Sequence, residues 1–82
     1  MPTALIIFGM RVVIYSNDHR PSHVHVIGGG REAVFALRCP LGPPVLQENY
    51  GCSRNVLLKI EQALIVNLAG LCIAWRNIHG PY

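Results

Sequence analysis

HVHVIGGGREAVFAL, the stretch at residues 23–37, encodes two strands and the turn between them. Histidine alternates with valine over residues 23–26, which is the period of two that a strand with one buried face shows. The glycines at 28–30 tolerate positive φ angles and are typical of a tight hairpin turn. Residues 32–37 are mostly apolar and predict a strand that pairs antiparallel with residues 23–27.

Short apolar runs on both sides of this hairpin predict further strands. Residues 4–8 and 11–15 are two such runs, separated by Gly9. A third run, residues 45–47, follows the proline-rich segment 40–44. We therefore expect four to five short antiparallel strands before the chain changes character.

The last third of the chain has a helical period. Apolar residues recur at steps of three and four through residues 53–79, with Ser53 as the N-cap and Gly80-Pro81 as the end. The middle of this segment, residues 63–75, is apolar on nearly every face, which indicates burial on more than one side. One side would cover the sheet and the other would contact another chain, and Gly70 could divide the helix into two.

The composition favours one domain that hides part of its surface in an assembly. The chain has 82 residues, of which 51% are hydrophobic and 13% charged, whereas an average domain has roughly 25% charged residues. We expect a single α+β domain over residues 1–82. Its residues 1–50 would form a small antiparallel sheet of four to five strands, packed on a long C-terminal helix at residues 53–79. The apolar helix would hold a homo-oligomer or a heteromer together.

Cysteine usage and the N-terminus suggest a cytoplasmic protein. Cys39, Cys52 and Cys72 are odd in number and far apart, which favours buried free thiols in a reducing cytosol over a disulfide framework. The first residues lack the charged region of a signal peptide. The apolar stretch at 63–75 is shorter than the ~20 residues that cross a bilayer, so no membrane partner is expected.

A histidine cluster precedes the hairpin. Three of the four histidines fall within residues 19–25, directly after Asp18. If residues 23–26 form a strand, alternation places His23 and His25 on one face. Two adjacent imidazoles can transfer protons, bind a metal ion or hold a phosphate group when protonated, and they can also be ordinary strand residues with satisfied ring nitrogens.

The first functional interpretation is metal-independent cleavage of RNA. His23 and His25 would act as acid and base, because an imidazole pKa of about 6.5 allows both roles at neutral pH. His19 and Asp18 would support them, and an arginine would stabilise the charged transition state. The candidate catalytic residues are His23, His25, His19, Asp18, Arg31 and Arg11.

The second functional interpretation is a metal site without any bound organic cofactor. His19, His23 and His25, together with Asp18 or His79, offer nitrogen and oxygen ligands that suit zinc or another transition metal. The spacing of these histidines does not by itself choose between metal binding and proton transfer.

The residues around the cluster also have two interpretations each. Asp18 is suited to cap the turn, and alternatively to orient a histidine ring. Glu32 is either exposed to solvent or faces His25 across the hairpin. His79 lies one helical turn after Trp75, where it either complements the negative end of the helix dipole or joins the site.

Four motifs together resemble a known family. They are Met1-Pro2-Thr3, Asp18-His19-x-Pro21-x-His23-x-His25-Val26, Gly28-x-x-x-Glu32-Ala33 and Trp75-x-x-x-His79. They resemble the small bacterial proteins of the domain of unknown function 4160 family, and the resemblance covers most of the chain. It implies a component of a toxin–antitoxin module whose partner is the cognate small protein of the same operon. The chain would be the toxin, with RNA as its substrate, or alternatively an antitoxin or regulatory module that holds a partner with its apolar helix.

Overall fold

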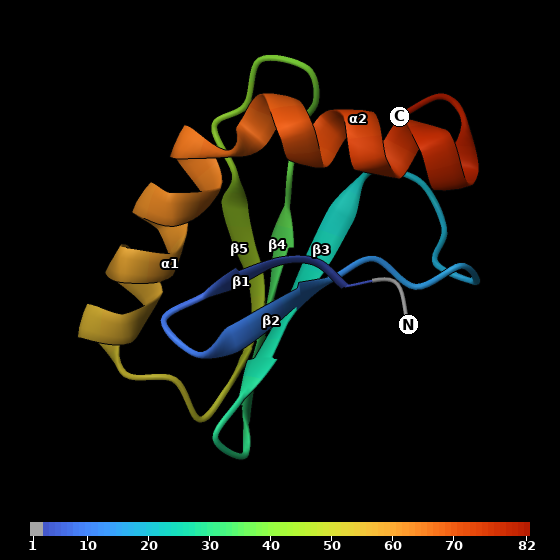
Figure 1. Ribbon diagram of the computed structural model, residues 1–82. Coiled ribbons are helices and arrows are strands. Elements are labelled where there is room, and N and C mark those ends of the chain that lie inside the picture. The colour runs from blue at the N-terminus through green and yellow to red at the C-terminus, as the bar shows by residue number, and fades with distance from the viewer. Residues whose placement is uncertain (1–2) are drawn as a thin grey trace.

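Five antiparallel strands follow one another in the sheet in the same order as in the chain, β1-β2-β3-β4-β5. The computed structural model describes residues 3–82, so Met1 and Pro2 of the opening motif lie outside the described residues. Two helices follow the last strand, which confirms the expected α+β fold (Figure 1). The elements are β1 (Thr3–Ile7), β2 (Met10–Val13), β3 (His23–Gly28), β4 (Arg31–Ala36), β5 (Val45–Tyr50), α1 (Arg54–Val66) and α2 (Leu68–His79).

The β3–β4 hairpin forms as its sequence predicts. Gly29 and Gly30 make the two-residue turn with φ angles of 59° and 74°, a conformation that side chains other than glycine rarely adopt. The turn sets the register in which His25 pairs with Val34. The valines of β3 are completely buried, and its histidines lie on the opposite face.

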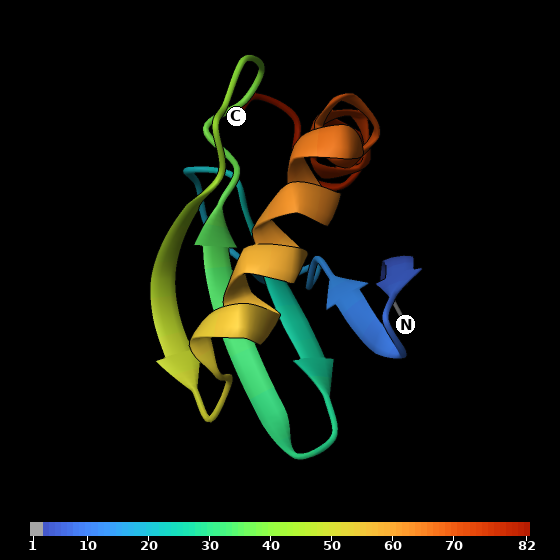
Figure 2. The same ribbon diagram turned by 90° about the vertical axis from the view of Figure 1, so that its left-hand side faces the viewer.

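The hydrophobic core lies between the sheet and the helices. Helix α1 begins after Ser53, whose hydroxyl accepts a hydrogen bond from the backbone N–H of Val56 at 3.2 Å, as an N-cap does. Its buried side chains Ile60 and Leu64 belong to one cluster with the buried residues of β2, β3 and β4. Helix α2 lies across one end of the sheet and places Trp75 in the same cluster (Figures 1 and 2).

The expectation of one continuous helix over residues 53–79 is wrong. The chain bends by 76° between α1 and α2, at Asn67 and not at Gly70. The Asn67 side chain donates a hydrogen bond to the carbonyl oxygen of Ala63 at 2.8 Å, and its backbone N–H donates to the same oxygen at 3.1 Å. A short polar side chain that binds its own backbone in this way competes with continued helix.

The two helices also answer the question of membrane spans for the described part of the chain. Within residues 3–82, neither helix alone is long and apolar enough to cross a bilayer. Taken together as a bent pair, the two helices have the length and composition of a membrane span, but the core helices of a soluble protein have these properties too.

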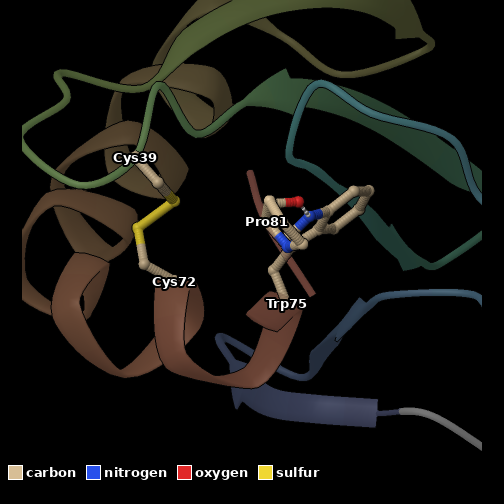
Figure 3. The surroundings of a disulfide bond; sticks show 4 residues. All are labelled: Cys39, Cys72, Trp75 and Pro81. Carbon is tan, nitrogen blue, oxygen red and sulfur yellow. Dashed lines mark hydrogen bonds between the residues drawn. A yellow bond between two sulfur atoms is a disulfide. The ribbon is translucent and has the colours of Figure 1, made fainter. Parts of the chain in front are cut away.

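The expectation that all cysteines are free thiols is wrong as well. Cys39, in the β4–β5 connection, and Cys72, in α2, form a disulfide across a Cα–Cα distance of 5.7 Å (Figure 3). Cys52 is a buried free thiol, as predicted. The pairing escaped the sequence argument because the two residues are 33 positions apart and meet only when α2 closes over the end of the sheet. The cytoplasmic location stays a prediction.

Candidate functional site

A groove with a volume of about 490 Å³ lies on the face of the sheet that the helices do not cover. Its floor and walls come from the polar face of β3, β4 and β5 and from residues 19–21 of the β2–β3 connection. The alternation that buries the valines of β3 turns His23 and His25 toward this groove.

Asp18, His23 and His25 meet at one point beside the groove. The Nε2 atom of His25 lies 3.3 Å from Oδ1 of Asp18, and the Nε2 atom of His23 lies 3.5 Å from the same oxygen. One ligand atom from each of the three residues lies within 4.8 Å of the other two. The three side chains are 12–18% exposed, so the cluster is reachable but largely sheltered.

The turn before β3 holds Asp18 in this place. Its backbone N–H donates to the carbonyl oxygen of Tyr15 at 3.1 Å, and its Oδ2 accepts from the backbone N–H of Tyr15 at 2.9 Å. Asp18 therefore caps the turn with one carboxylate oxygen and faces the histidines with the other. Both interpretations of this residue apply at once.

The Nδ1 atoms of the two histidines are already occupied. Nδ1 of His23 lies 3.0 Å from the carbonyl oxygen of Pro21, and a carbonyl oxygen only accepts, so this nitrogen carries a hydrogen. Nδ1 of His25 lies 3.1 Å from Oε2 of Glu32, which confirms that Glu32 faces His25 across the hairpin. With Nδ1 protonated, a neutral imidazole presents a lone pair at Nε2.

Two Nε2 lone pairs that face one carboxylate oxygen would repel it. A metal ion between the three atoms would replace this repulsion with attraction.

A row of neighbouring, mutually tilted rings connects the cluster to α2. The ring of His23 lies 5.3 Å from that of Trp75, which lies 4.2 Å from that of His79. Nε2 of His79 donates to the carbonyl oxygen of Tyr15 at 2.9 Å, and the Tyr15 ring meets the edge of His25 at 4.9 Å. His79 thus joins the surroundings of the site through its neighbours and not as a direct member of the cluster.

The groove is acidic although the chain has a net charge of +3. Glu32 and Glu48 line it and Asp18 lies beside it, which are three of the four acidic side chains in the chain. Arg20 supplies a guanidinium group to the lining. The Tyr50 hydroxyl donates to Glu48, and this hydrogen bond and the charge of Glu48 raise the pKa of Tyr50 above its ordinary value of 10.0.

Three of the predicted catalytic residues lie away from the cluster. His19 lines the rim of the groove with an exposed side chain. Arg31 lines a separate groove on the α1 side of the sheet, together with Val56 and Lys59. Arg11 is exposed on β2 and does not line the histidine groove.

Three ionisable residues that line the groove, Arg20, Glu48 and Tyr50, are not among the predicted catalytic residues. Glu48 and Tyr50 are two apart, and the strand period places them on one face of β5. The sequence predicts a strand only over residues 45–47, so this part of β5 is missing from the prediction. Arg20 lies inside the histidine motif, whereas the predicted charge-stabilising arginines lie on strands.

The comparison with protein families gives one match. The model of the family described as Domain of unknown function (DUF4160) matches residues 9–76, which include Asp18, His23, His25 and Trp75. No curated protein and no solved structure matches the chain.

Proposed function

Since the chain belongs to the DUF4160 family, whose description gives no function, we propose from the site itself that this protein is a metal-dependent hydrolase. Asp18, His23 and His25 would hold one divalent transition metal ion, for which Zn²⁺ is the best fit. The ion would face the groove on the open side of the sheet.

One observation carries the proposal, namely the convergence of two imidazole Nε2 atoms on one carboxylate oxygen while both Nδ1 atoms are bonded elsewhere. Histidines that bind a metal almost always donate their other N–H to a carboxylate or a backbone carbonyl, which fixes the ring and its tautomer. His25 has Glu32 in this role and His23 has the carbonyl oxygen of Pro21.

The distances support the same conclusion. With zinc–ligand bonds of about 2.1 Å, two ligand atoms of a tetrahedral site are about 3.4 Å apart. The two nitrogen–oxygen separations in the cluster are 3.3 and 3.5 Å. A set of two histidines and one carboxylate is a common catalytic arrangement, and it leaves a fourth position for water, whose pKa bound zinc lowers to about 7.

The charge of the groove favours this proposal over metal-free cleavage of RNA. Three carboxylates against one guanidinium leave an excess of two negative charges when the histidines are neutral, and such a groove repels a phosphate backbone. A divalent ion would offset this excess. In addition, His23 and His25 face the same oxygen of Asp18, whereas an acid and a base need to act on different atoms of a substrate.

Metal binding is tested by zinc content and calorimetric titration of the purified protein. We expect one zinc ion per chain, and we expect His25→Ala and Asp18→Asn to lose it. An asparagine at position 18 can still cap the turn, so the Asp18→Asn variant removes a ligand without removing the cap. Glu32→Gln should weaken zinc binding by about tenfold or more, because Glu32 orients the His25 ring without touching the metal. The matched control is His19→Ala, which should bind like the original protein. Unchanged binding in His25→Ala, or lost binding in His19→Ala, would contradict the proposal.

A role as the toxin of a toxin–antitoxin module is our proposal for the cellular context, with the cognate small protein as partner and RNA as a possible substrate. Beside the family resemblance, large apolar side chains exposed on both helices support a protein partner. These are Leu58, Ile65, Val66, Ile73 and Ile78, which are 41–82% exposed.

Growth of bacteria that express the chain alone tests this role. Arrest by the original protein, and none by the His23→Ala/His25→Ala double variant at equal soluble expression, is the expected result. Growth without arrest in both cases would exclude the toxin role and favour an antitoxin or binding module.

A further inference from the structure

A covalent link fixes the part of α2 that reaches the histidine cluster. The Cys39–Cys72 disulfide ties the first turns of α2 to the β4–β5 connection. Cys72 and Trp75 are three positions apart on the helix and therefore lie on one face (Figure 3). Their exposed fractions are 2% and 0%. The position of the Trp75 ring thus depends on a turn of helix that the disulfide holds.

Helix α2 contacts the cluster directly through Trp75 and indirectly through His79. The Trp75 ring lies against the His23 ring at 5.3 Å between ring centres, with their planes tilted by 52°. One helical turn later, His79 donates to the carbonyl oxygen of Tyr15, whose backbone N–H in turn donates to Asp18. His23 therefore contacts α2 directly, and Asp18 is linked to α2 through Tyr15.

We propose that the oxidation state of Cys39 and Cys72 sets the affinity of the histidine cluster for metal, with Trp75 as the positioning residue between them. The proposal rests on the metal site proposed above and adds its regulation. With the disulfide formed, Trp75 holds the His23 ring in the orientation that binds metal. With the two thiols reduced, α2 keeps its apolar contacts but loses the covalent constraint, and the ring of His23 is held less firmly.

The redox step is a thiol–disulfide exchange with a small disulfide such as oxidised glutathione. Cys39 is partly exposed and Cys72 is buried, so the Cys39 thiolate attacks first and releases one glutathione thiolate. The Cys72 thiolate then displaces the second one from the mixed disulfide. The two cysteines lose two electrons and two protons. The oxidised glutathione takes up these electrons and protons and becomes two molecules of reduced glutathione.

Zinc titration of the full chain in both redox states tests the proposal. Trp75 is the only tryptophan in the chain and its ring lies against that of a proposed ligand, so its fluorescence reports zinc binding. We expect zinc to bind about tenfold more weakly after reduction, the lower end of the range for groups that orient metal ligands. Thiol counting under denaturing conditions should find one free thiol, from Cys52, before reduction and three after it.

Variants separate the coupling from a general loss of stability. The Cys39→Ala/Cys72→Ala variant should bind zinc like the reduced protein, and Cys52→Ser should bind like the oxidised one, with circular dichroism showing that each is folded. Both Trp75 variants lack the fluorescent probe and are measured by calorimetry. Trp75→Phe should keep the redox dependence because it keeps a ring against His23, whereas Trp75→Leu should bind zinc weakly in both states.

Two negative results have different meanings. Equal zinc affinity in the oxidised and reduced protein would overturn the coupling and leave the metal site standing. Failure of the oxidised protein to bind zinc would refute the proposed function itself, and the coupling with it.

Discussion

Reduction of the Cys39–Cys72 disulfide should lower the free energy of unfolding by about 4 kcal/mol. The bond joins residues 33 positions apart and so restricts the unfolded chain. For a loop of this length the loss of chain entropy is about 12.5 cal/mol/K, or about 3.7 kcal/mol at 25 °C. Because the total unfolding free energy of a small domain is only about 5–15 kcal/mol, the reduced protein should be only marginally stable.

Urea unfolding followed by Trp75 fluorescence measures this loss. With a slope of about 1 kcal/mol per molar urea for so small a chain, the midpoint should fall by nearly 4 M on reduction. The Cys39→Ala/Cys72→Ala variant should unfold near the reduced protein, and Cys52→Ser is the control that keeps the bond. A loss of less than about 1 kcal/mol in both proteins would show that the bond does not stabilise the fold by restricting the unfolded chain.

Two further predictions concern tight packing and a titrating group. Gly28→Ala should lower the free energy of unfolding by about 1–3 kcal/mol, because the added Cβ would lie 2.9 Å from Cγ and 3.1 Å from Cα of Met10. At Gly70 in α2 an added Cβ meets no described atom within 4 Å, so Gly70→Ala should raise this free energy by up to about 1 kcal/mol. Urea unfolding of the two variants checks both signs. The Tyr50 phenol should ionise above pH 10.0 in an absorbance titration and nearer to it in Glu48→Gln. Since folding raises the pKa of Tyr50, the contribution of this group to stability is present below its pKa in the unfolded chain and is lost as the pH rises through its pKa in the folded protein. Equal titrations of Tyr50 in the two proteins would contradict Glu48 as the cause of the raised pKa.

Local signals predicted the centre of the fold well and the helix break poorly. The β3–β4 hairpin depends on the alternation of its own residues and on a glycine turn at 28–30, so sequence alone was sufficient. The apolar period of the last third continues across Asn67, so periodicity could not distinguish one helix from two. The signal for the helix break was the polar side chain of Asn67 inside an apolar run, whereas Gly70 lies within α2 and does not interrupt it.

The candidate site divides in the same way. His23, His25 and Glu32 follow from strand period and hairpin register, which are short-range properties. The same alternation would have placed Arg31 on the face opposite Glu32, where the structure has it.

The long-range contacts of the site had no counterpart in the sequence pattern. The contact between the Trp75 and His23 rings depends on how α2 closes over the end of the sheet, and so does the Cys39–Cys72 bond. Neither contact follows from spacing along the chain, since each joins residues that are more than 30 positions apart.

Binding of a metal ion at the Nε2 atoms of His23 and His25 can be observed in long-range proton–nitrogen correlation spectra of the imidazoles, recorded before and after one equivalent of Zn²⁺. The Nε2 signals of both residues should move to the position of a metal-bound nitrogen while Nδ1 keeps its hydrogen, and the signals of His19 and His79 should stay unchanged. Unchanged Nε2 signals for His23 and His25, or a response confined to His19 and His79, would contradict metal binding at these atoms.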